Sequence, residues 1–247
     1  MRLTVLGAGP AYTDRDGATG ACYLVSLGST SILLDLGQGS FPRIFRHLRA
    51  ETLDAVLVSH LHPDHYIDLV ALRHYLRWEF TPPRRMRVLA PSDLANRLDH
   101  LHRFPGFTGE SFDVQTMGTG PHRVGDLTIT ATLVTHTDES YAIRVAGTSG
   151  RGLVYSGDCG AAMDIAPLVR PGDVLLAEAS FGPGPSDPGA KHLDGPEVGR
   201  LARATNASLA LLTHLQMGYD PDATVAAAQA EYDGPVRMVW PGSVEEI

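Results

Sequence analysis

The side chains best suited to chemistry stand close together in one short segment, Ser59-His60-Leu61-His62-Pro63-Asp64-His65. Imidazole nitrogens and carboxylate oxygens make a zinc-type ligand set, which iron and manganese also accept. His60 and His62 stand two residues apart, so on an extended strand end they point to the same side. Asp64 and His65 follow on a turn and can be aimed at a second point. A polar turn with exposed histidines is the alternative, but four ligand-type residues at this spacing favour a site for two neighbouring cations.

The residues on either side of this segment predict the elements that position it. The apolar run at 55–58 has the length and branching of a buried strand, and Pro63 prevents its simple continuation. Beyond Pro63, the apolar residues are spaced for a helix with one apolar side: Ile67, Leu69, Val70, Leu72 and Leu76. We therefore expect Asp64 to lie where a helix begins.

The plan of an apolar strand followed by a hydroxyl residue and a ligand-type residue recurs along the chain. Leu-Val-Ser leads to His60, Leu-Val-Thr leads to His136, and Leu-Leu-Thr leads to His214. A fourth run, Leu-Val-Tyr-Ser-Gly, leads to Asp158. Ligands in open α/β sheets gather at the carboxyl ends of strands, so these positions can converge on one edge. The pattern predicts three further ligands, and an aspartate beside glycine on a tight turn can bridge two metals.

Length and composition suit one large α/β domain over residues 1–247, made of two similar halves. The formal net charge of −8 gives no global footprint for nucleic acid. No apolar run is long enough to span a bilayer, and no basic-then-apolar leader opens the chain. Cys22 and Cys159 form neither a CxxC pair nor a disulfide framework. We therefore expect a cytoplasmic protein with no membrane partner.

Several local features allow more than one interpretation. Asp35 ends a predicted strand and either caps the turn or orients a metal-binding histidine. Ser92 is expected to start a helix, and Asp194 with Glu197 resembles a capped helix start. The glycine-rich segment 103–122 has weak periodicity, and we expect part of it to be a loop that leans over the site.

Five arginines with two aromatic residues follow the predicted helix. We call them the arginine cluster: Arg73, Arg77, Arg84, Arg85 and Arg87, with Tyr75 and Trp78 among them. The cluster can meet an anionic substrate, but arginines that flank a Pro-Pro turn more often form a solvated face. We favour the solvated face.

These motifs together resemble the metallo-β-lactamase superfamily, over essentially the whole chain. Its HxHxDH pattern is present at 60–65, accompanied by Asp35-Leu36-Gly37, His136, Ser156-Gly157-Asp158 and Thr213-His214. The resemblance implies an α/β fold, a four-layer αβ/βα sandwich. It also implies two metals: the first held by His60, His62 and His136, the second by Asp64, His65 and His214, with Asp158 bridging them.

A finer resemblance is to the ribonuclease Z-like phosphodiesterase branch. It rests on Lys191-His192-Leu193-Asp194-Gly195 and on Glu178-Ala179-Ser180-Phe181. The segments 191–195 and 231–236 are still more similar to compact bacterial enzymes described as atypical cyclic-nucleotide phosphodiesterases. Cys159 departs from the family's usual threonine after the bridging aspartate. No insertion has the size of the tRNA-gripping arm of ribonuclease Z, which disfavours structured nucleic acid as a partner.

The resemblance implies a dinuclear phosphodiesterase that hydrolyses a small phosphodiester, with a cyclic nucleotide as the expected substrate. Two cations about 3.5–4 Å apart can lower the pKa of a bridging water towards ~7, which supplies the attacking hydroxide. Asp64 would aim this hydroxide, and His192 would donate a proton to a phosphate oxygen or the leaving alkoxide. Zinc is the expected metal, with manganese or iron as alternatives.

Three other functions stay open from the sequence. A tRNA 3′-end endonuclease of the ribonuclease Z type shares the motifs, although the arm is missing. A lactone or thioester hydrolase shares the fold but leaves His192 without an obvious purpose. A non-enzymatic metal-binding or partner-binding module is disfavoured because all seven ligands are retained. Relatives in this family often dimerise, so a homodimer is compatible with the resemblance.

Overall fold

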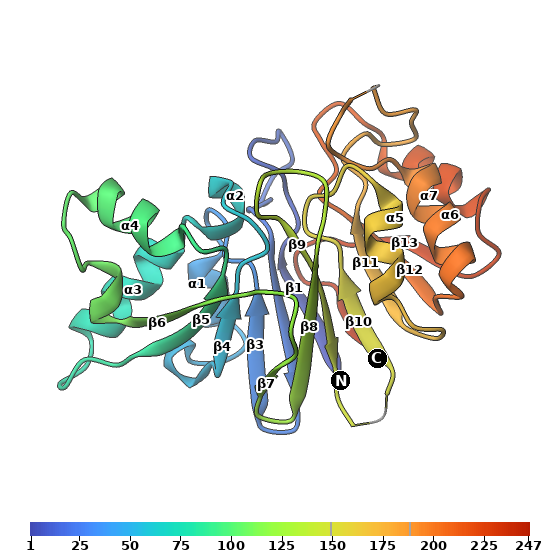
Figure 1. Ribbon diagram of the computed structural model, residues 1–247. Coiled ribbons are helices and arrows are strands. Elements are labelled where there is room, and N and C mark those ends of the chain that lie inside the picture. The colour runs from blue at the N-terminus through green and yellow to red at the C-terminus, as the bar shows by residue number, and fades with distance from the viewer. Residues whose placement is uncertain (149, 188) are drawn as a thin grey trace.

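Two seven-stranded sheets lie face to face at the centre of the computed structural model, which describes residues 1–148, 150–187 and 189–247 (Figure 1). The first sheet has the order β14 (Val244–Glu246), β1 (Arg2–Gly7), β2 (Cys22–Leu27), β3 (Thr30–Leu34), β4 (Ala55–Leu57), β5 (Met86–Ala90) and β6 (Phe112–Thr116). The second has the order β13 (Val236–Met238), β12 (Leu209–Thr213), β11 (Val174–Glu178), β10 (Gly152–Tyr155), β9 (Tyr141–Ala146), β8 (Leu127–Leu133) and β7 (His122–Val124).

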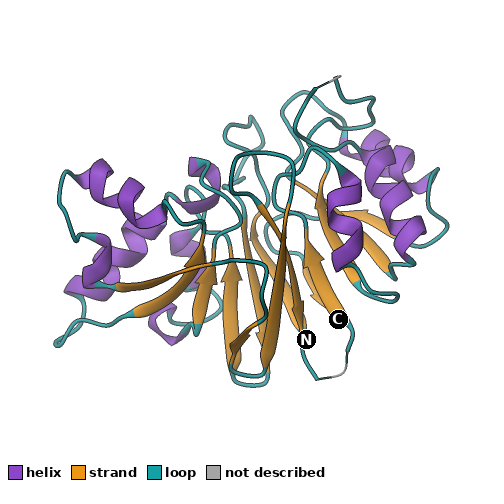
Figure 2. Cartoon of the chain, in the orientation of Figure 1, coloured by secondary structure: helices purple, strands orange, loops and turns teal. Residues whose placement is uncertain are grey.

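The helices lie on the outside of this pair of sheets (Figure 2). The first half carries α1 (Phe41–Ile44), α2 (Pro63–Tyr66), α3 (Leu69–Trp78) and α4 (Leu94–His102), with 3-10 turns η1 (Ala50–Thr52) and η2 (Thr108–Glu110). The second half carries α5 (Ala162–Ile165), α6 (Gly195–Thr205) and α7 (Pro221–Gln229), with the 3-10 turn η3 (Ala166–Leu168). The arrangement is the four-layer αβ/βα sandwich of two similar halves, and it confirms the predicted fold class. No helix among the described residues is both long enough and apolar enough to cross a membrane.

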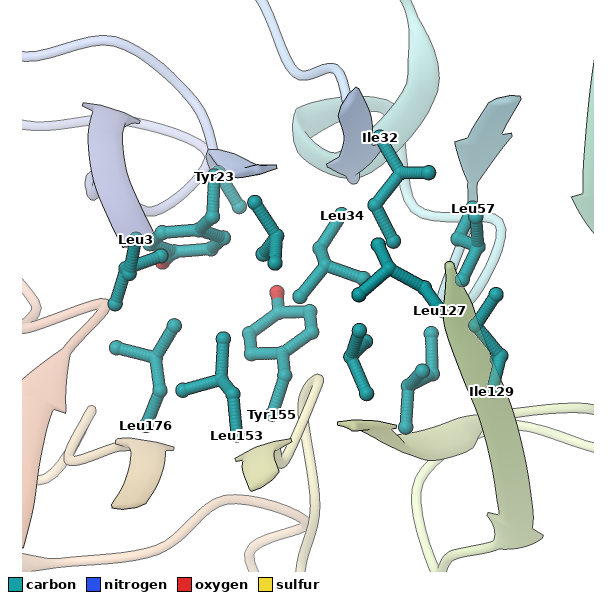
Figure 3. Packing of buried hydrophobic residues seen from close by; sticks show 14 of the residues in the cluster. Leu3, Tyr23, Ile32, Leu34, Leu57, Leu127, Ile129, Leu153, Tyr155 and Leu176 are labelled. Carbon is teal, nitrogen blue, oxygen red and sulfur yellow. The ribbon is translucent and has the colours of Figure 1, made fainter. Parts of the chain in front are cut away.

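A continuous apolar core joins the two sheets (Figure 3). Leu3 and Leu34 of the first sheet face Leu153 and Leu176 of the second, and all four are fully buried. Two further apolar clusters fill the space between each sheet and its own helices. Each fully buried leucine contributes about 1.5–3 kcal/mol relative to an exposed one, so this packing fixes the two halves against each other.

Parallel pairing aligns the strand ends that the sequence singled out. In the first sheet β3, β4, β5 and β6 are parallel neighbours, and in the second β10, β11, β12 and β13 are parallel neighbours. Strand β8 pairs antiparallel with β9, which pairs antiparallel with β10, so β8 runs in the same direction as β10. The carboxyl ends of β8, β10 and β12 therefore meet at one edge of the second sheet, as predicted.

Segment 103–122 corrects the expectation of a loop over the site. It forms η2 and then β6, which pairs in parallel with β5 at the edge of the first sheet. Phe107 and Phe112 anchor the segment in the core beneath α3 and α4. An edge strand packs on few neighbours and needs only one or two apolar residues, which explains its weak periodicity in the sequence.

The start of one helix also differs from the expectation. Helix α4 begins at Leu94 with Asp93 as its N-cap, and Ser92 instead donates through its backbone and hydroxyl to Glu139. The last residues of the chain, 244–246, form β14 and pair with β1, so the chain ends in the half where it began. The predicted cap of α6 is confirmed: Asp194 and Glu197 form a reciprocal capping box.

The arginine cluster is held mainly by partners near the edge of the first sheet. Arg73 is buried, donates to the carbonyl of Phe107 and pairs with Glu110. Arg85 pairs with Asp113 of β6. These contacts tie α3 and β5 to the segment around β6. Arg84 and Arg85 are exposed, as a solvated face requires, but Arg73 is buried and corrects the expectation for that residue.

Candidate metal centre

The segment 60–65 lies where β4 passes into α2. His62 is the extended residue before the helix, with φ −82° and ψ 141°, and Pro63 occupies the first turn. The carbonyl of Asp64 accepts a bond from Ala21, which brings the turn against the preceding strands. A Cβ atom on Gly37 would stand 1.8 Å from this carbonyl, so the close approach requires glycine there.

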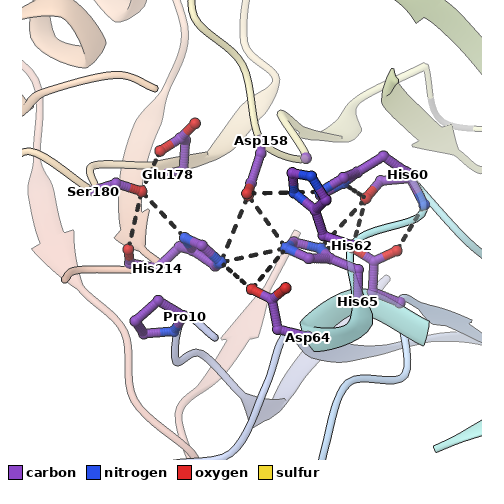
Figure 4. Close-up of polar contacts among 12 residues, drawn as sticks. Pro10, His60, His62, Asp64, His65, Asp158, Glu178, Ser180 and His214 are labelled. Atoms are coloured by element: carbon purple, nitrogen blue, oxygen red, sulfur yellow. Dashed lines mark hydrogen bonds and ion pairs between the residues drawn. The ribbon is translucent and has the colours of Figure 1, made fainter. Parts of the chain in front are cut away.

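The structure brings all seven predicted ligands together at the strand ends (Figure 4). Within each of two groups, the ligand-type atoms lie within 4.8 Å of one another: His60, His62, His136 and Asp158 form the first group, and Asp64, His65 and His214 form the second. The side chains come from both halves of the molecule. We call the two groups together the metal centre.

Asp158 lies between the two groups. Its Oδ2 atom is 3.7 Å from Nε2 of both His60 and His136. Its Oδ1 atom is 3.3 Å from Nε2 of His65 and 3.6 Å from Nε2 of His214. One oxygen therefore faces each group, as a bridging carboxylate requires.

Hydrogen bonds on the outer side of the rings orient the histidines of the first group. The Nδ1 atom of His136 lies 2.8 Å from the carbonyl of Lys191, to which it can only donate. The Nδ1 atom of His60 lies 3.1 Å from the hydroxyl of Ser59. A proton on Nδ1 leaves the lone pair on Nε2, the atom that faces Asp158, so each ring presents a ligand atom to the centre.

The second group is oriented in the same way. The Nδ1 atom of His65 donates to Asp35 at 2.7 Å, and Nδ1 of His214 lies 3.1 Å from the hydroxyl of Ser180. Their Nε2 atoms are 3.3 Å apart and face the centre. Burial alone would lower the pKa of His65, but the carboxylates of Asp158 and Asp35 raise it well above its usual value. The two carboxylates therefore favour positive charge next to the ring of His65.

Asp35 resolves the two interpretations that the sequence left open. Besides His65, its carboxylate accepts hydrogen bonds from the backbone and hydroxyl of Ser59 and from the phenol of Tyr155, all at 2.7–2.8 Å. Asp35 has φ 61°, a left-handed conformation that costs a non-glycine residue about 1–3 kcal/mol. Its carboxylate orients a histidine of the metal centre and connects the two sheets.

The donor set fits divalent metal ions. Two buried polar atoms at the centre, Nε2 of His60 and Oδ1 of Asp158, have no hydrogen-bond partner among the described residues. Unpaired buried groups of this kind cost about 1–3 kcal/mol each unless something binds to them. Burial lowers the pKa of His60 well below its usual value, which keeps the ring neutral as a ligand must be. Histidines and carboxylates in this arrangement are suited to divalent cations.

Next to the centre, His192 forms a pair with Glu178. Nδ1 of His192 lies 3.0 Å from Oε1 of Glu178, and the same oxygen accepts a bond from the backbone of Cys159. Burial alone would lower the pKa of His192, but the hydrogen bond and charge of Glu178 raise it to about 9. Glu178 is buried and also accepts from the hydroxyl of Ser180, so it supports both His192 and, through Ser180, His214.

The sequence analysis did not assign a role to Glu178. A signal was present, because Glu178 ends an apolar strand in the same way as the predicted ligands do. The remaining histidines lie outside the metal centre: His47, His74, His100, His102 and His122.

The metal centre opens into a cavity of about 300 Å³. It is lined by residues of the centre and its neighbour His192, and also by residues of two loops: His62, Asp64, Asp158, His192 and His214 in the first set, and Pro10, Ala11, Tyr12 and Gln216 in the second. Pro10 lies beside Asp64 and His214 (Figure 4). The chain segment that follows β1 therefore forms part of the cavity wall.

Comparison with known proteins places the chain among metallo-hydrolases. Residues 30–215 match the family model for the Beta-lactamase superfamily domain. An uncharacterized protein of Mycobacterium leprae is 34% identical over 253 residues, which cover all of this chain and 89% of that protein. The probable metallo-hydrolase YhfI of Bacillus subtilis is 28% identical over the full length of both chains. Ribonuclease Z of Myxococcus xanthus is 25% identical, covering 100% of this chain and 98% of its own.

Solved structures show the same fold. The crystal structure of YhfI from Bacillus subtilis superimposes with a TM-score of 0.88 at 25% identity, covering 100% of this chain and 99% of that chain. A diphosphatase from the PhnP family superimposes with a TM-score of 0.77 at 15% identity, covering 100% of this chain and 97% of that one.

Proposed function

The chain belongs to the metallo-β-lactamase superfamily, and from this premise we propose that it is a dinuclear metal-dependent phosphodiesterase. Its expected substrate is a small phosphodiester, and a cyclic nucleotide in particular. The observation that carries the proposal is the position of Asp158, with one carboxylate oxygen facing each group of histidines. Two groups joined by one carboxylate suit two cations that act on a single phosphate. We assign this activity to one domain over residues 1–247.

Each group would hold one cation. His60, His62 and His136 would bind the first, Asp64, His65 and His214 the second, and Asp158 both. When bound, two divalent cations supply Lewis-acid activation of water and neutralise phosphate charge. Zinc is the metal we expect from this donor set, with manganese or iron as alternatives.

Two residues of the chain would act on the substrate directly. His192 lines the cavity, and the hydrogen bond and charge of Glu178 raise its pKa to about 9. With Nδ1 bound to Glu178, its other nitrogen can donate to a phosphate oxygen or to the leaving alkoxide. The carboxylate of Asp64 lines the same cavity and can accept a hydrogen bond from the attacking water.

The size and charge of the cavity support a small substrate. About 300 Å³ stands at the lower end of the range for small-molecule pockets. Among the described residues that line it, none is lysine or arginine, and the chain has a formal net charge of −8. A tRNA would need many cationic contacts along its backbone. A second candidate, the ribonuclease Z reaction, is supported by the likeness to ribonuclease Z proteins such as that of Myxococcus xanthus.

A panel of substrates tests the proposal. Protein purified without chelator and loaded with zinc or manganese would be assayed on bis-p-nitrophenyl phosphate, cyclic AMP, a precursor tRNA and a lactone. We expect turnover of the two small phosphodiesters. Site-specific removal of a tRNA 3′ trailer without cleavage of cyclic AMP would favour the ribonuclease, and turnover of the lactone alone would favour the third hypothesis, an ester hydrolase.

A further inference from the structure

The part of the cavity lining that comes from the loop after β1 has a distinct chemistry. Pro10, Ala11 and Tyr12 present it with apolar and aromatic surface from the loop after β1. Tyr12 is 71% exposed and takes no part in any of the apolar clusters of the core. A large planar side chain that is mostly exposed and lines a cavity is suited to stack on a flat ring.

Gln216 lines the same part of the cavity from the loop after β12. Its backbone is bonded on both sides, to Ser180 and to Arg15. Its side-chain amide makes no hydrogen bond with the described residues, although the residue is half-buried. An amide with a free donor and a free acceptor matches the edge of a base that carries an amino group beside a ring nitrogen.

Arg15 joins the Tyr12 loop to the Gln216 loop. Its guanidinium donates to the carbonyls of Leu215 at 2.8 Å, Gln216 at 3.1 Å and Tyr219 at 2.9 Å. Three bonds from one planar group to one loop fix the loop in a single orientation. Because Arg15 follows Tyr12 by three residues, the same contact sets the distance between the two loops.

The base of the Tyr12 loop is also bound to the first half. Gln38 donates to the carbonyl of Pro10 at 3.2 Å, and Arg43 donates to that of Gly17. The loop is therefore held at both ends as well as by Arg15. A binding surface fixed in this way loses little entropy when a ligand docks.

We propose that Tyr12 and Gln216 form a nucleobase subsite, with Tyr12 stacking on the ring, Gln216 reading its edge, and Arg15 as the positioning residue that holds the two loops together. The inference rests on the proposed function and names its substrate class: a nucleoside phosphodiester with an amino-bearing base such as adenine. The absence of lysine and arginine among the described lining residues agrees with an uncharged group at this end.

The test compares cyclic AMP with the 3′,5′-cyclic phosphate of methyl riboside, which has the same reacting centre but no base. Stacking on an aromatic side chain is worth about 5- to 150-fold in affinity. Tyr12→Ala should raise KM for cyclic AMP by a factor in this range and leave KM for the abasic substrate unchanged, while Tyr12→Phe should retain the wild-type value. Met217→Ala, an exposed residue of the neighbouring loop that does not line the cavity, serves as the matched control.

Two further variants test the remaining parts of the subsite. Gln216→Leu should abolish the preference for cyclic AMP over purine riboside 3′,5′-cyclic phosphate, which lacks the amino group. Arg15→Met should raise KM for cyclic AMP. For the abasic substrate, both kcat and KM should stay at their wild-type values.

Direct binding of cyclic AMP, measured by calorimetry, separates this inference from the proposed function. Tyr12-dependent binding without turnover would support the subsite and contradict the phosphodiesterase. If the protein hydrolyses diesters, and KM is the same for wild type and Tyr12→Ala on both cyclic AMP and the abasic substrate, the subsite would be overturned while the phosphodiesterase activity stands.

Discussion

The bond between His192 and Glu178 gives His192 a task different from that of the other histidines. The five histidines of the metal centre direct a nitrogen at Asp158 or at one another, whereas His192 is held by the buried carboxylate of Glu178, which raises its pKa to about 9. Proton donation by such a group typically contributes about 10²–10⁴-fold to a rate. The role is a property of the pair, because the pKa of His192 depends on Glu178.

His192→Ala should therefore retain two metals and normal folding while kcat falls by about 10²–10⁴-fold on a diester with an alkyl leaving group. With a p-nitrophenolate leaving group, which needs little protonation, the loss should be smaller. Metal analysis checks that both metals are retained, and steady-state kinetics check the fall in kcat. His47→Ala, at an exposed histidine, serves as the control. Equal losses on both substrates would assign His192 to the phosphate oxygens, and unchanged rates would exclude it from the reaction.

Asp35 acts on the centre without contacting a metal. It accepts a hydrogen bond from Nδ1 of His65 and three further hydrogen bonds. Asp35→Asn has nearly the same side-chain shape, but its NH2 group replaces one of the two accepting oxygens and faces these donors. Loss of such a supporting carboxylate typically lowers metal affinity about 10–100-fold. Competition with a chromophoric chelator would measure the change, with the exposed Asp54→Asn as the matched control. Wild-type affinity in Asp35→Asn would show that Ser59 alone orients the turn.

The residues of the metal centre were predictable from the sequence because they lie just beyond the carboxyl ends of apolar strands or on the turn that follows, and parallel strands bring such positions to one edge. Glu178 follows the same rule. Tyr12, Gln216 and Arg15 were not predictable in this way, since they come from irregular loops. Their proximity depends on how β1 and β12 meet across the two sheets, which no local pattern records.

At the scale of elements, a buried ion pair fixes β9 against the start of β11. Arg144 donates from Nε and Nη2 to the two oxygens of Asp173 at 2.7 and 2.9 Å. Asp173 also accepts from the backbone of Gly152 and Arg170. Residues 152 and 173 lie where β10 and β11 begin, so the pair belongs to the opposite end of these strands from Asp158.

Arg144→Met should lower the free energy of unfolding by about 3–5 kcal/mol at neutral pH, because it leaves a buried carboxylate unpaired. Burial alone would raise the pKa of Asp173, but Arg144 and the two backbone bonds lower it below its usual value. A lowered folded-state pKa contributes stability above the unfolded value of about 3.9, and this is lost as pH falls through the folded pKa. Urea unfolding of the metal-free proteins should therefore show that Arg144→Met is less stable than the wild type. The difference in the free energy of unfolding should be largest near pH 7 and smaller below about pH 4. A difference in unfolding free energy that does not depend on pH would mean that Arg144→Met destabilises the protein through lost packing and not through lost charge pairing.

The elements that the sequence missed have a physical reason in common. Strand β6 and strand β14 are both at edges of the first sheet, where one neighbour supplies all pairing. Edge strands need neither a long apolar run nor strict alternation, so local patterning is weak there. The start of α4 was misplaced by one residue because Ser92 and Asp93 are both good caps, and Ser92 is used by Glu139 instead.

At the scale of the whole molecule, the metal centre lies on the boundary between the two halves. The first half supplies His60, His62, Asp64 and His65, and the second supplies His136, Asp158 and His214. Across the same boundary, Tyr155 of the second sheet donates to Asp35 beside the first. Bound cations would therefore connect the halves at one edge, in addition to the apolar core between the sheets.

Removal of the metals should lower the melting temperature of the entire protein. A ligand that binds only the folded state stabilises it by about 4 kcal/mol at a free concentration of 1,000 times its Kd, and 1 kcal/mol shifts Tm by about 2–4 °C in a chain of this size. Protein treated with chelator should thus melt about 8–16 °C below the zinc-loaded form and recover on adding zinc. His214→Ala, which removes a ligand of the second group only, should show a smaller zinc-dependent shift and bind about one equivalent, while Asp54→Asn should match wild type. A melting temperature that does not respond to chelator, in protein shown to have held two metals, would mean that the apolar core alone joins the two halves.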